Sequence, residues 1–156
     1  MISPIPVEDR HAALELLSLQ MQAYLVEAER IGFPDLPPLA DTLDALQSSE
    51  EQFFGVRMDG ELAGAIAYTR EERLVTICRL MVSPRFFRRG IGRALLRFVE
   101  EKETGAAAFL VSTATANEPA VRLYEQAGYR KAEERPIAPG ISLTYFRKEI
   151  RLTGQN

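Results

Sequence analysis

The stretch that decides the fold runs from Val82 to Leu96 and reads VSPRFFRRGIGRALL. Before it, residues 74–82 form an apolar, β-branched run that predicts a strand, and Ser83-Pro84 stops that strand. After it, apolar residues recur with helical spacing through residues 90–102, and Gly105 lies beyond the predicted end. The sequence therefore predicts a strand, a glycine turn and a helix in direct succession.

The glycine turn has the composition of an anion-binding site. Gly90 and Gly92 let the main chain approach a bulky anion, and the first helical turn offers backbone N–H groups without helical partners. Cations crowd this turn, where the helix end is already partly positive: Arg85, Arg88, Arg89 and Arg93. They destabilise the helix end unless an anion joins them, which favours a bound phosphate. The alternative is a solvated basic face beside a tight turn.

Two common phosphate motifs do not fit this turn. A P-loop requires Lys followed by Ser or Thr after its second glycine, and neither is present. A dinucleotide-binding fingerprint requires a third glycine where Leu95 stands, and 156 residues fall short of a two-half dinucleotide fold.

The flanking sequence predicts an α/β fold of one domain. One apolar stripe marks an N-terminal helix that bends or breaks before Gly32: Leu14, Leu17, Met21, Leu25 and Ala28. Residues 33–38 are predicted to be a loop, and residues 41–47 a short helix capped by Asp41. Strands at 52–58 and 62–68 flank the hairpin signal Asp59-Gly60. The second hairpin strand is followed by a turn (70–73), the central strand–turn–helix, a strand (107–113), a helix (117–128) and strands near 129–134 and 141–150. This order implies a mixed sheet with helices on its faces.

Composition excludes several classes of function. The net charge is −3, so no global basic field favours nucleic acid or an anionic membrane. A single cysteine, Cys78, and a single histidine, His11, leave no disulfide and no Cys/His zinc site, and no metal is expected. The first residues have no signal-peptide pattern and no apolar run reaches the roughly 20 residues of a membrane span, so a cytoplasmic protein is expected.

Two blocks of sequence carry a family resemblance. LMVSP (80–84) with RGIGRALL (89–96), and NEPAVRLYEQAGY (117–129), resemble the two motifs of the GNAT-type N-acetyltransferase superfamily. The resemblance covers the chain from Gln52 onward. It implies a mostly antiparallel mixed sheet in which strands 74–82 and 107–113 splay apart, with acetyl-CoA between them. It further implies a cofactor-binding region at 52–150, a helical acceptor-side region at 1–50 within one domain (1–156), and a homodimer through the C-terminal strands as one option.

The resemblance also implies the cofactor-binding residues: Leu80, Met81, Val82, Phe87, Arg88, Arg89, Gly90, Ile91, Gly92, Arg93, Asn117 and Tyr124. Phe87 departs from the family pattern, in which Gln or Arg begins the phosphate turn. Tyr124 is the implied acid that protonates the leaving thiolate, although its place at the border of an apolar helix face also fits packing. No base is named, because Glu71 and Glu72 are turn residues and a water relay is equally allowed.

Other residues receive weaker assignments. Arg79 is expected near the acceptor and would favour acceptors that carry a carboxylate or phosphate. Cys78 is expected to be a small core residue, and Tyr68 and Tyr145 line either the acceptor pocket or the core. The predicted function is acetyl transfer from acetyl-CoA to a primary amine of a small molecule, a peptide or a protein. The alternatives are a non-catalytic acyl-CoA binding or sensing domain and a nucleotide-binding redox module.

Overall fold

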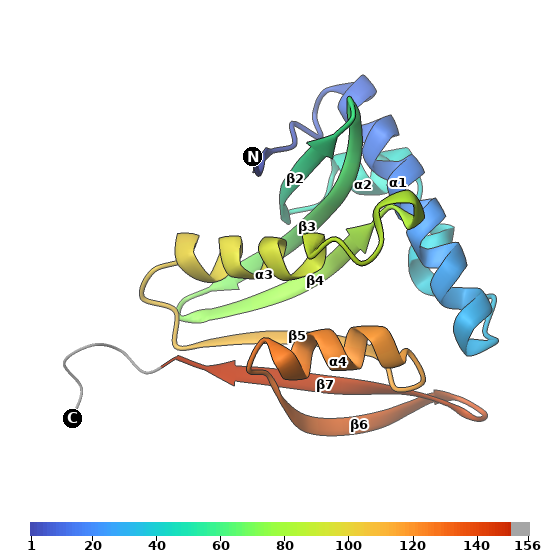
Figure 1. Ribbon diagram of the computed structural model, residues 1–156, viewed down its shortest axis with the longest axis vertical. Coiled ribbons are helices and arrows are strands. Elements are labelled where there is room, and N and C mark those ends of the chain that lie inside the picture. Colours follow the sequence, from blue (N-terminus) through green and yellow to red (C-terminus); the bar gives the residue numbers. More distant parts are fainter. Residues whose placement is uncertain (151–156) are drawn as a thin grey trace.

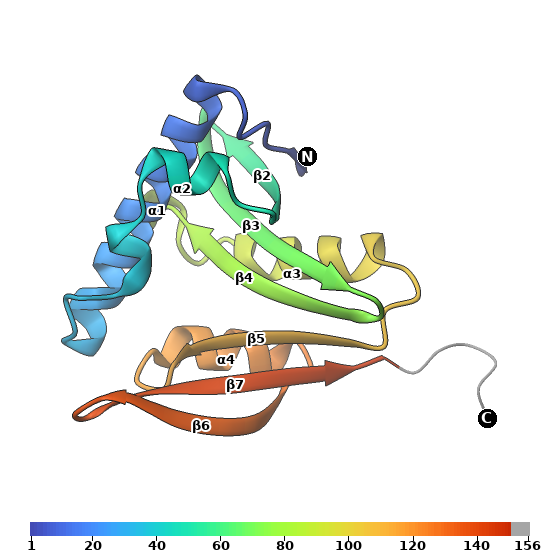
Figure 2. The same ribbon diagram turned by 180° about the vertical axis from the view of Figure 1, so that it is seen from behind.

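A seven-stranded sheet organises the chain, and helices cover both of its faces (Figures 1 and 2). The computed structural model describes residues 1–150. Its strands are β1 (Ser3–Pro4), β2 (Gln52–Met58), β3 (Glu61–Glu71), β4 (Leu74–Val82), β5 (Ala108–Ala114), β6 (Arg130–Ala138) and β7 (Ile141–Glu149), in the spatial order β1-β2-β3-β4-β5-β7-β6. The helices are α1 (Arg10–Ile31), α2 (Leu43–Gln47), α3 (Ile91–Lys102) and α4 (Glu118–Gln126), with 3₁₀ turns η1 (Pro37–Ala40) and η2 (Pro84–Phe86). The predicted mixed, mostly antiparallel α/β fold is confirmed.

The central strands diverge as predicted. β4 and β5 are parallel, and they pair only through Leu74–Thr76 and Ala108–Leu110. Beyond these residues β4 and β5 no longer pair with each other, although β4 remains paired with β3 and β5 with β7, and the gap between β4 and β5 is visible in Figure 1. β4 also bulges at Cys78, because Arg79 faces Ala67 while Ile77 faces Tyr68 on β3. A bulge bends its strand, so this one turns the end of β4 away from β5.

The N-terminal helix differs from its prediction. α1 is continuous from its cap at Asp9 to the left-handed Gly32 (φ 71°), with no break before Gly32. The predicted apolar stripe is correct at Ala28, which is buried, but wrong at Leu14 and Leu25, which are 44% and 54% exposed. The buried face consists of Ala13, Leu16, Leu19, Gln20 and Ala28. Apolar residues occur on more than one face of this helix, and contact with the sheet selects the face that carries Leu16 and Leu19.

The short second helix begins later than predicted. Thr42, not Asp41, caps α2, and its hydroxyl accepts a hydrogen bond from Ala45 N at 3.1 Å. The Asp41 carboxylate instead contacts Gln20 and Arg79, both at 2.8 Å. A carboxylate that binds a guanidinium forms a stronger interaction than a helix cap, which explains the shift.

The sheet separates two apolar clusters that reflect the alternation of side chains along β3. Ile66 packs under α3 and α4, whereas Ala65 and Ala67 pack toward α1 and α2. The contact with α3 is close at Gly64, where an added Cβ would lie 2.6 Å from Ile91 Cγ2 and 3.2 Å from Met81 O. The first turn of α3 therefore rests directly on the sheet, beside the end of β4.

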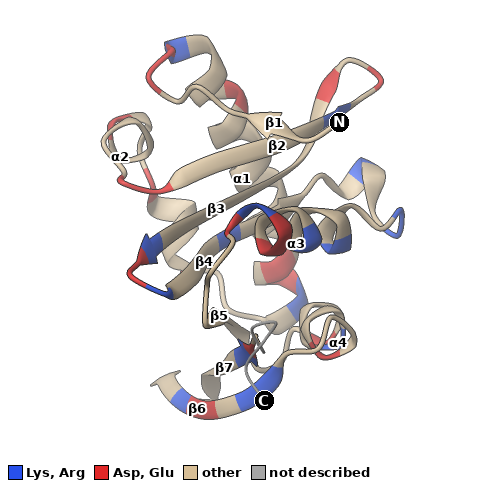
Figure 3. Cartoon of the chain, turned by 90° about the vertical axis from the view of Figure 1, so that its left-hand side faces the viewer, with Lys and Arg blue, Asp and Glu red and all other residues tan. Residues whose placement is uncertain are grey.

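The surface carries both signs of charge. Figure 3 shows Lys and Arg interspersed with Asp and Glu over the helices and strands, in agreement with the net charge of −3. Within residues 1–150, no helix combines the length and apolarity that crossing a bilayer requires.

Candidate active site

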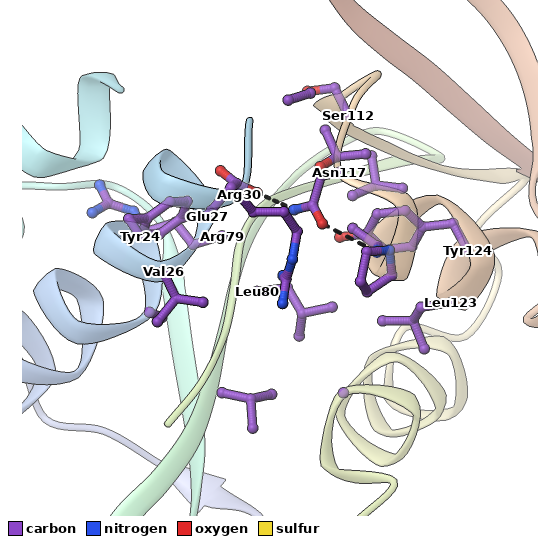
Figure 4. Close-up of a pocket in the computed structure, with 18 of the residues that line it drawn as sticks. Tyr24, Val26, Glu27, Arg30, Arg79, Leu80, Ser112, Asn117, Leu123 and Tyr124 are labelled. Carbon is purple, nitrogen blue, oxygen red and sulfur yellow. Dashed lines mark hydrogen bonds between the residues drawn. The ribbon is translucent and has the colours of Figure 1, made fainter. Parts of the chain in front are cut away.

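A cavity of about 1070 Å³ lies where β4 and β5 separate. Its walls come from the second half of α1, the loop from Phe33 to Pro38, the ends of β4 and β5, the turn before α3, and α4 (Figure 4). Of the predicted cofactor residues, ten line this cavity: Leu80, Val82, Phe87, Arg88, Gly90, Ile91, Gly92, Arg93, Asn117 and Tyr124. The Met81 side chain lies in the cluster beneath α1, and Arg89 is not among the lining residues.

The turn before α3 exposes backbone donors at one end of the cavity. Arg88 (φ 64°) and Gly90 (φ 74°) both adopt left-handed conformations, and Gly90 occupies the N-cap position without a side-chain cap. Ala94 N donates to Gly90 O at 3.0 Å, so the N–H groups that precede Ala94 in the helix have no helical acceptor. No acidic residue stands in the first turn of α3. These donors and the positive helix end form an anion-binding arrangement.

The arginines of this turn have separate roles. Arg85 pairs with Glu61 at 2.6 Å, and Arg89 lies over the Phe86 ring at 5.3 Å, so these two stabilise the turn. Arg93 donates to Gln126 O at 3.1 Å, which links α3 to α4. Arg88 and Arg93 line the cavity and supply positive charge there.

Tyr124 belongs to the core and to the cavity at once. Its ring packs against Tyr129 and Phe146, with centroids 6.0 and 5.7 Å apart, and the residue is only 5% exposed. The residue lines the cavity, and its hydroxyl makes no hydrogen bond to another of residues 1–150. Burial raises the pKa of this phenol, and the negative charge of Glu27 raises it further, so Tyr124 is protonated at neutral pH.

Asn117 joins the two sides of the cavity. It caps α4, where its Oδ1 accepts from Ala120 N at 3.5 Å. Its Nδ2 donates to the Glu27 carboxylate of α1, the contact drawn as a dashed line in Figure 4. α1 and α4 are thereby connected across the opening between the splayed strands.

Glu27 lines the cavity and is a candidate site residue that the sequence did not reveal. Its half-buried carboxylate lies in the cavity together with Tyr24, and burial raises its pKa while the bond from Asn117 lowers it to a smaller extent. The useful signal was its register: Leu16, Gln20 and Glu27 recur at helical spacing on the inward face of α1. A polar residue on a face that otherwise packs inward is a candidate functional residue, and the wrongly placed apolar stripe hid it.

Arg79 takes part in a network of hydrogen bonds and ion pairs inside the protein. Its guanidinium contacts both Glu51 oxygens at 2.9 Å, Asp41 Oδ2 at 2.8 Å and Gln20 Oε1 at 2.8 Å, and it lies over the Phe53 ring. Two carboxylates already neutralise this cation. The geometry therefore does not support the expected preference for acceptors with a carboxylate or phosphate.

The remaining candidates lie elsewhere or differ from expectation. Glu71 and Glu72 sit at the β3–β4 turn, at the opposite end of β4 from the cavity. Cys78 is exposed at the β4 bulge rather than buried in the core, and it lines the cavity. Tyr68 is fully buried and donates to Glu103 at 2.6 Å, and Tyr145 lies under the Arg135 guanidinium, away from the cavity. Within residues 1–150, no group of three His, Cys, Asp or Glu side chains is placed to hold a metal.

Comparison with known proteins places this site in a family. The acetyltransferase (GNAT) domain matches residues 38–150. UPF0157 protein YqkA of Bacillus subtilis (strain 168) is 44% identical over 146 residues, which are 94% of this chain and 43% of that protein. The chain thus spans less than half the length of this relative.

Solved structures share the whole fold at low sequence identity. The ribosomal-protein-S18-alanine N-acetyltransferase from Escherichia coli superposes with a TM-score of 0.77 at 20% identity, covering 100% of this chain and 97% of the other. A PaiA N-acetyltransferase from Thermoplasma acidophilum in complex with coenzyme A gives a TM-score of 0.77 at 14% identity, covering 96% and 99%. The family match spans more than half of the sequence and the splayed strands have the expected geometry, so the chain belongs to the GNAT acetyltransferase family.

Proposed function

We propose that this domain transfers the acetyl group of acetyl-CoA directly to a primary amine. One observation carries the proposal: the N-terminus of α3, which has no acidic residue in its first turn, borders the large cavity where the parallel strands β4 and β5 separate. Acetyl-CoA supplies an acetyl group activated as a thioester, and its diphosphate is the anion that the turn before α3 lacks.

The chain has the groups to bind such a molecule along its length. The N–H groups from Arg88 to Arg93, with the Arg88 and Arg93 side chains, would hold the diphosphate. Past Thr76, the β5-facing edge of β4 has no partner strand, so the main chain of Leu80–Val82 is available to pair with an amide-bearing arm. Backbone N–H groups at this edge are also suitable donors to a carbonyl oxygen that gains charge during transfer.

Tyr124 is suited to act as the acid. Its raised pKa keeps the proton on the phenol at neutral pH, and its hydroxyl has no competing protein acceptor among the described residues. Burial also raises the pKa of a thiol held in the same surroundings, so the proton affinities of phenol and thiolate shift in the same direction. Proton donation from Tyr124 to the departing sulfur follows as its role.

The other end of the cavity is assigned to the acceptor. It is formed by α1 and by the loop from Phe33 to Pro38, within the region 1–50 that the resemblance assigns to acceptor recognition. The residues of this end decide which amines enter.

The direct test measures binding and turnover separately. Calorimetry with acetyl-CoA should show saturable binding, and a thiol-release assay with a panel of amines should show turnover for at least one. Arg93→Ala should bind acetyl-CoA about tenfold more weakly, ~1.5 kcal/mol, at the low end for a charged hydrogen bond because Arg93 is exposed. Arg97→Ala, one turn further along the exposed face of α3, is the matched control and should bind normally.

Each negative result has a distinct meaning. Binding without turnover across the panel would favour the non-catalytic acyl-CoA sensor instead. No binding of acetyl-CoA, or equal affinity in Arg93→Ala and Arg97→Ala, would contradict the assignment of the turn before α3.

A further inference from the structure

Glu27 occupies a distinctive position in the cavity. It projects from α1 between Tyr24 of the same helix and Asn117 and Tyr124 of α4 (Figure 4). Its pKa rises through burial, and its charge in turn raises the pKa values of both Tyr24 and Tyr124, so the carboxylate and both phenols share one environment. This environment is at the opening of the strand gap, where the acceptor and the acyl donor must meet.

The charge of Glu27 is not neutralised by an ion pair. Within residues 1–150 no salt bridge involves its carboxylate, and its hydrogen-bond partner, Asn117 Nδ2, is neutral. Arg30, one turn along α1, lowers the pKa of Glu27 only as the third and weakest influence. Arg79 on β4 is occupied by Glu51 and Asp41. A half-buried carboxylate whose hydrogen-bond partner is neutral keeps its negative charge uncompensated, so one bound cation would stabilise it.

The acceptor end of the cavity is otherwise largely apolar. Phe33, Leu36 and Pro38 follow α1, and Ile137 and Leu143 come from the β6–β7 hairpin. Figures 1 and 2 both show the tip of this hairpin at the same side of the molecule as the C-terminal end of α1. Asp35 adds a second negative charge to this end, and Arg30 of α1 adds one positive charge. The surroundings suit an apolar body attached to a cationic head.

We infer that Glu27 binds the ammonium group of a carboxylate-free primary amine with an apolar body, and that it removes the proton which blocks attack by the nitrogen. This inference rests on the proposed acetyltransferase function and adds the substrate class and the base. In the step itself, one N–H bond of the ammonium group breaks, its electron pair remains on nitrogen, and the proton passes to a Glu27 oxygen. Bulk water then receives that proton through the open mouth of the cavity.

The direction of the Glu27 pKa agrees with this role. A carboxyl group whose pKa is raised holds a proton more tightly than a solvated glutamate, so it is the stronger base. The groups that face it are Tyr24 and Arg30 from α1 and Tyr124 from α4, with Cys78 and the paired Arg79 on β4 lining the same cavity. The two phenols and the thiol are protonated and neutral at pH 7, because the pKa of each is raised.

The test compares Glu27→Gln with a matched control, Glu29→Gln, which alters an exposed carboxylate two residues away on α1. Glu27→Gln keeps the shape and an oxygen acceptor for Asn117. Because the folded pKa of Glu27 is raised, its ionisation disfavours the folded state once the pH passes its ordinary value, so the variant should melt no lower than the wild type at pH 7. Acetyl-CoA affinity by calorimetry should be unchanged in both variants.

Turnover should separate the two variants. For the best amine, kcat/KM of Glu27→Gln should fall about 10²- to 10⁴-fold, the usual contribution of a positioned base. The limb of the wild-type pH profile that falls toward acid, above the ordinary range of glutamate, should disappear with it. Glu29→Gln should retain both the rate and the limb.

The acceptor class is tested with a matched pair of amines, phenethylamine and phenylalanine, which differ by one carboxylate. The wild type should prefer phenethylamine at least tenfold in kcat/KM, which corresponds to ~1.4 kcal/mol. A preference for phenylalanine would overturn the substrate class. Wild-type rates in Glu27→Gln, with an active wild type, would overturn the role of Glu27 alone. A wild type that binds acetyl-CoA and acetylates no amine would remove the proposed function and this inference together.

Discussion

Replacing Arg79 with Met tests the polar network that holds α1 and the segment before α2 to the sheet. The guanidinium connects β4 to Gln20 on α1, to Asp41 before α2 and to Glu51 before β2. Met fills a similar volume over Phe53 but donates no hydrogen bond, so the substitution isolates the polar contacts from the packing.

The magnitude follows from the exposure of the partners. The side chains of Arg79 and Glu51 are 14% and 13% exposed, and Asp41 is 28% exposed. Removing one partner of a buried ion pair costs about 3–5 kcal/mol, because the other charge is left buried and unpaired. Water reaches part of this cluster, so the low end applies, about 3 kcal/mol. For a domain of this size, ~3 kcal/mol lowers Tm by about 6–12 °C.

Urea unfolding followed by circular dichroism measures this loss directly. Arg57→Met is the matched control, because its ion pair with Glu15 leaves Arg57 56% exposed and should contribute under ~1 kcal/mol. Adding Glu51→Gln to Arg79→Met should recover part of the stability by removing the unpaired charge. A loss below ~1 kcal/mol in Arg79→Met, or no recovery in the double variant, would refute a desolvated ion-pair network as the tie between α1 and the sheet.

Three further substitutions probe the site. Gly64→Ala places a Cβ 2.6 Å from Ile91 Cγ2, so it should destabilise the fold by about 1–3 kcal/mol in urea unfolding. It should also weaken acetyl-CoA binding, because it displaces the start of α3. Unchanged affinity would show that the position of α3 is not fixed at Gly64. Tyr124→Phe should lower kcat about 10²-fold with unchanged acetyl-CoA affinity, because the thiolate must then leave unprotonated, whereas equal turnover at every pH would remove the acid role. Asn117→Ala should lower Tm by about 2–4 °C, through loss of ~1 kcal/mol of helix capping, and normal stability would mean that the cap of α4 contributes little.

The cofactor half of the molecule was readable from sequence because backbone geometry determines it. The Asp59-Gly60 turn, with φ values of 52° and 78°, fixed the first hairpin, and the bounds of β2 and β4 agree with their predictions. Pro and Gly near the start of α3 act through dihedral angles and missing side chains, which depend little on distant contacts. Such local signals can therefore be recognised in a single sequence.

The half that we assign to the acceptor could not be predicted from the sequence, because side chains from distant segments create it. The contact of Glu27 with Asn117 joins residues 90 positions apart, and that of Arg79 with Gln20 joins residues 59 positions apart. The two-residue strand β1 and the 3₁₀ turns η1 and η2 were missed, since elements this short leave no periodic pattern. The face of α1 that turns inward was likewise decided by the sheet, not by helix periodicity.

This division also explains how Phe87 can replace the polar residue that usually begins the phosphate turn. Phe87 borders the cavity and is 38% exposed, but the donors of the turn are main-chain N–H groups whose direction depends on the left-handed Arg88 and Gly90. A side-chain change at position 87 leaves those donors in place, so it should alter affinity without removing the site. At the end of the cavity that we assign to the acceptor the opposite holds, because the recognition group that we propose is a side chain, the carboxylate of Glu27. Substitutions of single residues should therefore change which acceptor binds far more readily than which acyl donor binds.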